Sequence, residues 1–94
     1  MKIDFRKDGD SLFVSLEGRL DTVTAPQLEA FLEQNPASAL ILDCEKLAYV
    51  SSAGLRVLLV AQKKLKDALK LIHVQEMVME VFEVTGFADI LVIE

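Results

Sequence analysis

The stretch Tyr49-Val50-Ser51-Ser52-Ala53-Gly54-Leu55-Arg56-Val57-Leu58-Leu59 joins the end of an apolar strand to the start of a long amphipathic helix. Two hydroxyls, those of Ser51 and Ser52, lie at the junction, where the positive end of the helix dipole stabilises negative charge. A serine before a helix is far more often a cap than a regulated site. Local chemistry alone therefore leaves both a helix cap and a phosphate site open.

The segments on either side of this junction predict a parallel strand pair. The apolar run Ala39–Cys44 is typical of a strand covered on both faces. The central helix is expected from Ser52 to about Ala68, because leucines recur at helical spacing along it. Leu69–Val74 predicts the next strand. Such a strand-helix-strand unit is a right-handed crossover, so Ala39–Cys44 and Leu69–Val74 are expected to be adjacent and parallel.

The N-terminal part of the chain predicts a hairpin. Ile3–Lys7 and Leu12–Glu17 flank the turn dipeptide Asp8-Gly9, and the second run alternates apolar and polar residues. Leu47–Val50, just before the central helix, is expected to be a second strand-like or turn segment.

Two further helices and a final strand complete the expected elements. A capping box of Thr24 and Gln27 opens a helix that ends near Gln34. Val78–Thr85 has the spacing of a helix core face, and Gly86 is expected to terminate that helix in a left-handed conformation. The short apolar segment 90–93 predicts a final or edge strand.

Together these elements predict an α/β fold in one domain, residues 1–94. The expected architecture is a mixed sheet of about four to five strands with an N-terminal hairpin, a parallel βαβ crossover and about three to four helices.

Composition excludes several classes of function. Fifteen acidic and ten basic residues give a net charge of −5, opposite to the basic surface of a nucleic-acid-binding protein. No stretch free of charged residues exceeds nine, too short to cross a membrane, and the polar first residues do not resemble a signal peptide. The lone Cys44 excludes an internal disulfide and fits a reducing compartment. The chain is therefore expected to be cytoplasmic, without nucleic-acid binding or membrane insertion.

Motifs for catalysis, nucleotides and metals are missing. The four glycines are too far apart for a phosphate-binding loop, and one His with one Cys cannot build a zinc site of nitrogen and sulfur ligands. Ser52, His73 and Asp43 supply the residue types of a hydrolase triad, but no Gly-x-Ser-x-Gly elbow surrounds Ser52. We therefore predict no catalytic residue, no metal ligand and no cofactor.

The central segment resembles the phosphoacceptor segment of the STAS domain family, of the bacterial anti-sigma factor antagonist type. The likeness extends along the chain, since residues 18–21 and 25–28 resemble the family's second strand and first helix, and residues 83–87 resemble the end of its closing helix. The match puts the family's phosphorylated serine at Ser52. Ser51 is the fallback, because it stands where the family often has Asp, and Ala53 follows where Ser is common.

The resemblance implies a partner switch rather than a catalyst. The unphosphorylated protein would bind an anti-sigma factor that is also an ATP-binding serine kinase, release a sigma factor, be phosphorylated by that kinase, and be reset by a serine phosphatase. The resemblance places the docking surface at the following residues: Asp21, Thr22, Ser51, Ser52, Ala53, Gly54 and Arg56. Gly54 would pack tightly against the sheet, let a partner reach the Ser52 hydroxyl, or do both.

The same family resemblance leaves a different class of function open. STAS domains also serve as accessory subunits of lipid-transport ABC complexes and as binding modules that work without phosphorylation. The sequence does not decide between these roles, nor whether the protein forms a homodimer.

Overall fold

The computed structural model describes residues 1–94, and the elements follow the predicted order. The strands are β1 (Lys2–Asp8), β2 (Ser11–Leu20), β3 (Ala39–Val50), β4 (Leu69–Ile72) and β5 (Val92–Ile93). The α-helices are α1 (Ala25–Gln34), α2 (Ser52–Leu65) and α3 (Glu76–Thr85). Two short 3-10 helices, η1 (Lys66–Ala68) and η2 (Phe87–Asp89), precede β4 and β5.

The strands form one five-stranded sheet in the order β1-β2-β3-β4-β5. β1 and β2 pair antiparallel, and the other three neighbouring pairs are parallel. In the crossover through α2, Leu40 lies opposite Leu69 and Asp43 lies opposite Ile72. The predicted α/β class, the hairpin and the parallel crossover are therefore confirmed.

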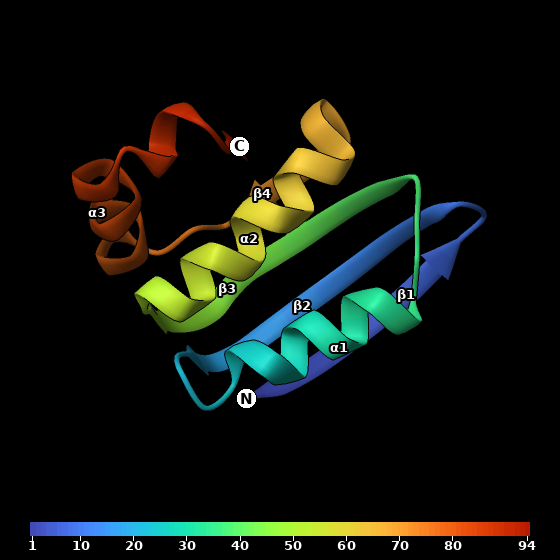
Figure 1. The fold of residues 1–94 in the computed structure, drawn as a ribbon, viewed down its shortest axis with the longest axis horizontal. Helices are drawn as coiled ribbons and strands as arrows, with labels where there is room; N and C mark the ends of the chain where they lie inside the picture. Colours follow the sequence, from blue (N-terminus) through green and yellow to red (C-terminus); the bar gives the residue numbers. More distant parts are fainter.

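The core lies between the sheet and the helices. Alternate residues of β2, namely Leu12, Val14 and Leu16, are buried, as the period-two pattern requires. Figure 1 shows α1 and α2 over one face of the sheet, with α3 beside the end of β3 at which α2 begins. The start of α2 therefore lies between two neighbours. One is the pair of carboxyl ends of β2 and β3, and the other is α3.

β3 is a single long strand rather than the two segments that the sequence predicted. Its pairing with β2 shifts twice, because β3 advances three residues from Asp43 to Lys46 while β2 advances two, and two residues from Leu47 to Tyr49 while β2 advances one. Each shift is a bulge, at which one extra residue breaks the alternation of faces. The strand therefore continues to Val50 although its sequence pattern does not.

Several details of the other elements depart from the expectation. β2 continues to Leu20 instead of ending at Glu17, and β4 ends at Ile72 instead of Val74, since His73 takes a positive φ of 56°. Thr24 is the N-cap residue of α1, but its side chain makes no capping hydrogen bond, so the predicted capping box is wrong. α2 ends at Leu65 instead of about residue 68, and Lys66 follows with a left-handed φ of 53°. The left-handed Gly86 at the end of α3 is confirmed, with φ 82°. None of the helices combines the length and the apolar content that a bilayer-spanning segment requires.

Phe82 anchors α3 to the sheet, since its side chain is 0% exposed, whereas Val84 of the same helix is 88% exposed. We expect Phe82→Ala to lower the free energy of unfolding by about 3–5 kcal/mol through lost burial and a residual cavity. Val84→Ala should change it by less than about 0.5 kcal/mol. Urea denaturation of both variants measures this, and equal losses would contradict the packing of α3.

Candidate functional site at the start of α2

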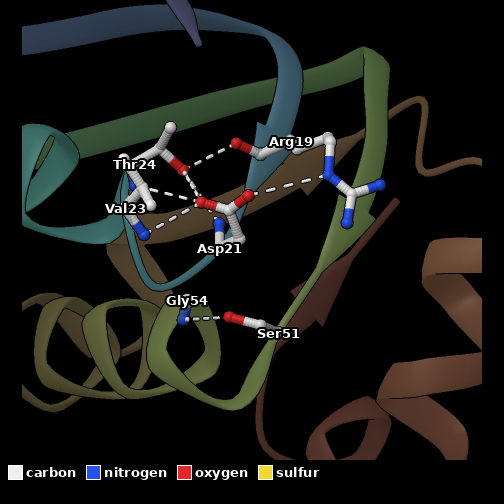
Figure 2. Close-up of polar contacts among 6 residues, drawn as sticks. All are labelled: Arg19, Asp21, Val23, Thr24, Ser51 and Gly54. Carbon is white, nitrogen blue, oxygen red and sulfur yellow. Dashed lines mark hydrogen bonds and ion pairs between the residues drawn. The ribbon is translucent and has the colours of Figure 1, made fainter.

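The two serines at the start of α2 have different roles in the structure. Ser51 is the N-cap residue, with extended backbone, and its Oγ accepts a hydrogen bond from the Gly54 N–H at 3.4 Å (Figure 2). Ser52 is the first helical residue, its side chain is exposed, and its hydroxyl has no hydrogen-bond partner within the protein. The cap and the free hydroxyl are therefore separate residues.

Gly54 is where α2 touches the end of β2. A Cβ atom at this position would lie 2.6 Å from Leu20 Cγ and 2.8 Å from the Leu20 carbonyl oxygen. The same carbonyl accepts a hydrogen bond from the Ser51 N–H at 2.9 Å, so it has little freedom to move. Tight packing against the sheet thus explains the glycine, and its missing side chain faces Leu20 rather than the Ser52 hydroxyl.

Asp21 organises the loop that joins β2 to α1. Its Oδ1 accepts hydrogen bonds from the N–H groups of Val23 at 3.0 Å and Thr24 at 3.1 Å, as Figure 2 shows. The Asp21 N–H in turn donates to Thr24 Oγ1 at 2.8 Å, and that hydroxyl donates to the Arg19 carbonyl at 2.6 Å. The side chains of Asp21 and Thr24 thus hold the backbone of this loop from both of its ends.

These contacts depress the pKa of Asp21. The hydrogen bond from the Thr24 N–H is the largest cause, and partial burial opposes it. Bonds from the Thr24 hydroxyl and the Val23 N–H, and the charge of Arg19, lower the pKa further. The carboxylate form is thus the one that the loop is built around.

Arg19 connects this loop to β3. Its Nε lies 3.6 Å from Asp21 Oδ2, and its guanidinium carbon lies 4.1 Å from the centre of the Tyr49 ring, a cation–π contact. Arg19 and Tyr49 are cross-strand partners in the parallel β2–β3 pair. Neither residue was among the predicted site residues, although their contact borders the Asp21 loop.

The structure brings most of the predicted site residues together. The loop holding Asp21 and Thr22 lies beside the segment 51–54, because Leu20 contacts Gly54. Thr22 is exposed, and Arg56 is exposed one helical turn beyond Ser52. Sequence reasoning missed Val23, which is 84% exposed at the centre of the loop. Its exposure follows from the hydrogen bonds of Asp21, and an Asp followed three residues later by Thr before a helix was a usable sign of them.

The residue types of a hydrolase triad do not meet. His73 Nδ1 donates to Asp43 Oδ1 at 3.0 Å, but Asp43 lies in the middle of β3 and seven residues, about 20 Å of strand, before Val50. Ser52 follows that strand end. The structure therefore separates the serine from the His–Asp pair.

Asp43, Glu45 and His73 are the residues that could hold a metal ion, since their ligand atoms lie within 4.8 Å of one another. The hydrogen bond between His73 and Asp43 already accounts for the proximity of two of them. Cys44 is the one thiol in the chain. Burial raises its pKa to about 12, so the thiol stays protonated and inert.

The fold and this helix start define a class of small α/β binding domains, and the comparisons with known proteins give the family. The chain matches the family model described as "Mlab, STAS domain" over residues 3–93. The chain therefore belongs to the STAS domain family.

Two relatives and one solved protein illustrate the similarity. BtrV of Bordetella bronchiseptica, provisionally named an anti-sigma factor antagonist, is 38% identical over 96% of this chain and 83% of its own length. The anti-sigma-B factor antagonist of Listeria monocytogenes is 30% identical over 94% of this chain and 82% of its own. SpoIIAA shares the fold in its unphosphorylated form (TM-score 0.79, 19% identity, 99% of this chain and 88% of that one). So does the phosphorylated form of Bacillus SpoIIAA (TM-score 0.73, 18% identity, 99% and 91%).

The contact between Gly54 and Leu20 predicts that a methyl group will not fit. We expect Gly54→Ala to lower the free energy of unfolding by about 1–3 kcal/mol, because the contact is to a hydrogen-bonded backbone carbonyl, and this outweighs the higher helix propensity of Ala. Ser52→Ala, in the same turn but exposed, should change it by less than about 0.5 kcal/mol. Urea denaturation tests both, and a stabilised Gly54→Ala would contradict the close approach.

The depressed pKa of Asp21 predicts a pH dependence of stability. A group whose pKa is lower in the folded state stabilises it fully above the unfolded value, here 3.8, and loses that contribution as pH falls through the folded pKa. Asp21→Asn should therefore lose less stability than wild type between pH 5 and pH 2, measured by thermal denaturation across that range. Asp67→Asn, an exposed carboxylate without a hydrogen bond, should follow the wild-type profile.

Proposed function

We propose that this protein is an anti-sigma factor antagonist, a binding switch controlled by phosphorylation of Ser52. In its unphosphorylated form it binds an anti-sigma factor that is also an ATP-binding serine kinase, and so frees a sigma factor. The named relatives support this class of function. The observation that carries the site is the exposed, unbonded Ser52 hydroxyl at the first position of α2.

The geometry favours Ser52 over Ser51 as the phosphoacceptor. Phosphorylation of Ser51 would turn the oxygen that accepts from the Gly54 N–H into an ester oxygen, a weaker acceptor, and would place the phosphate at a half-buried position. Phosphorylation of Ser52 breaks no hydrogen bond, and its side chain extends to solvent, where a kinase can reach it. Ser51 is the fallback if Ser52 is not modified.

A phosphate on Ser52 would leave the domain folded. It adds about −1.5 to −2 charges at the positive end of α2, where the helix dipole stabilises it by about 1 kcal/mol. Arg56, exposed four residues later, lies on the same side of the helix and adds attraction. The change is therefore local, at the surface that meets the partner.

The partner surface comprises the residues brought together at the start of α2. We place Thr22 from the loop, residues 51–54 and Arg56 in it, with the Asp21 carboxylate holding the loop in position at its edge. At that surface, the bulk and charge of a desolvated phosphate would reduce affinity about a hundredfold, or ~3 kcal/mol, which is sufficient for release. A serine phosphatase resets the switch.

The remaining expectations follow from this role. A regulator of this kind has no catalytic activity of its own, and Ser52 lies too far from the His73–Asp43 pair to form a triad. We place the protein in the cytoplasm, where transcription regulators work and where the free Cys44 thiol stays reduced.

An accessory-subunit role is the second candidate. The family model that matches carries the Mlab description, and a STAS domain model alone does not separate a subunit of a lipid-transport ABC complex from a switch. The neighbouring genes discriminate: a small histidine-kinase-like ATPase favours the switch, and a transporter ATPase favours the subunit.

The switch predicts the behaviour of matched serine variants. Incubated with the anti-sigma factor kinase of the same organism and ATP, wild type and Ser51→Ala should gain one phosphate and lose affinity about a hundredfold. Ser52→Ala should bind, gain no phosphate and resist release. Ser52→Asp, with a smaller charge, should bind more weakly than unmodified wild type.

Intact mass and isothermal titration give the two readouts for each variant. Phosphate on Ser52→Ala but not on Ser51→Ala would move the acceptor to Ser51. Full binding by phosphorylated wild type would contradict the switch.

A further inference from the structure

The loop between β2 and α1 presents an apolar side chain to solvent. Val23 is 84% exposed, and it is one of the two most exposed large apolar residues in the chain, with Val84 of α3. An isolated exposed valine is ordinary on a protein surface. Val23 differs because its own N–H and the N–H of Thr24 are held by hydrogen bonds to Asp21.

The backbone around Val23 has little freedom to bury that side chain. The N–H groups of Val23 and Thr24 both donate to Asp21 Oδ1, at 3.0 and 3.1 Å. Thr24 Oγ1 closes the loop on the other side by contacts with the Asp21 N–H and the Arg19 carbonyl. Figure 2 shows the bonds from Val23 and Thr24 meeting at one oxygen of the Asp21 carboxylate. The loop is thus built in the conformation that exposes the valine.

The same contacts change the expected role of Asp21. Its Oδ1 accepts from two backbone N–H groups, its Oδ2 lies 3.6 Å from Arg19 Nε, and its side chain is only 28% exposed. A carboxylate occupied in this way has little capacity left for a partner. Asp21 therefore acts as a positioning residue for the loop.

The loop is continuous with the proposed phosphorylation site. Leu20 precedes Asp21, accepts the hydrogen bond of the Ser51 N–H at 2.9 Å and contacts Gly54. The partner that covers Ser52 therefore meets the same rigid edge. An apolar side chain beside polar ones, here Val23 between Thr22 and Thr24 in the loop, is a common composition of a protein interface.

We propose that Val23 is an apolar anchor of the docking surface and inserts into an apolar recess of the anti-sigma factor. The inference rests on the proposed function and names the contact that the loop makes. A side chain held in its binding conformation before association loses little conformational entropy on binding, so it contributes more affinity than a mobile side chain of the same size.

The test compares two exposed valines by titration against the purified anti-sigma factor kinase of the same organism. Val23→Ser should weaken binding about tenfold, because it removes apolar contact and leaves a hydroxyl in an apolar recess. Val84→Ser, the matched control with 88% exposure on α3, should bind as wild type does. Both variants should keep the wild-type thermal denaturation midpoint.

A second pair of variants tests the role of Asp21. The side-chain oxygen of Asn can accept the same two backbone hydrogen bonds, so Asp21→Asn should retain most of the affinity while Asp21→Ala loses it. Equal losses for both, with unchanged stability, would show that the carboxylate itself contacts the partner and would overturn its positioning role.

The outcomes separate this inference from the proposed function. If wild type does not bind the kinase, the proposed function fails and this inference with it. If wild type binds and Val23→Ser binds equally well, or if both valine variants weaken binding equally, only the anchor role of Val23 is overturned.

Discussion

The close approach of α2 to the end of β2 is the constraint on which the site depends. Leu20 contributes its carbonyl to the Ser51 N–H and its side chain and backbone to the surface against which Gly54 packs. Because this contact leaves no room for a Cβ, the helix start cannot slide or tilt without losing a hydrogen bond. The exposed Ser52 and the Asp21 loop are thereby fixed relative to each other by one residue that is 0% exposed itself.

Sequence periodicity predicted the fold where each element follows a single rule. The crossover from β3 through α2 to β4 was predictable because an apolar run, a leucine-spaced helix and a second apolar run follow in order. β3 was only half predictable. Its first bulge leaves Glu45 and Lys46 both exposed, and its second leaves Ala48 and Tyr49 both exposed. The resulting breaks in alternation have the sequence appearance of a strand end. β3 continues past these breaks because it pairs with β2 as far as Val50, and that pairing comes from the tertiary fold and not from the local sequence.

The site was predictable in its location but not in the use of its polar atoms. A serine pair before a helix, together with the family resemblance, was sufficient to choose the start of α2 as the candidate site, and the structure shows that its residues lie together. Which hydroxyl caps the helix depends on the backbone of Ser51, which no residue pattern specifies. Asp21 was expected to face a partner, and the structure turns its carboxylate toward Val23 and Thr24 instead. Asp and Thr each have several local hydrogen-bonding options, and the sequence does not specify that Thr24 Oγ1 donates to the Arg19 carbonyl.

A rigid site also limits how the proposed phosphorylation of Ser52 would control binding. A phosphate would add up to about two negative charges to a net charge of −5, but salt screens exposed charges beyond about 8–10 Å, so this change in charge acts only at short range. Nor does the geometry of α2 offer a second packing of its first turn, since Leu20 fills the space beside Gly54. Neither steering from a distance nor a change of fold is therefore available to the modification. Its effect must arise at contact, where the phosphate is desolvated against the partner, and this requires the partner to cover Ser52 itself and not merely the adjacent loop.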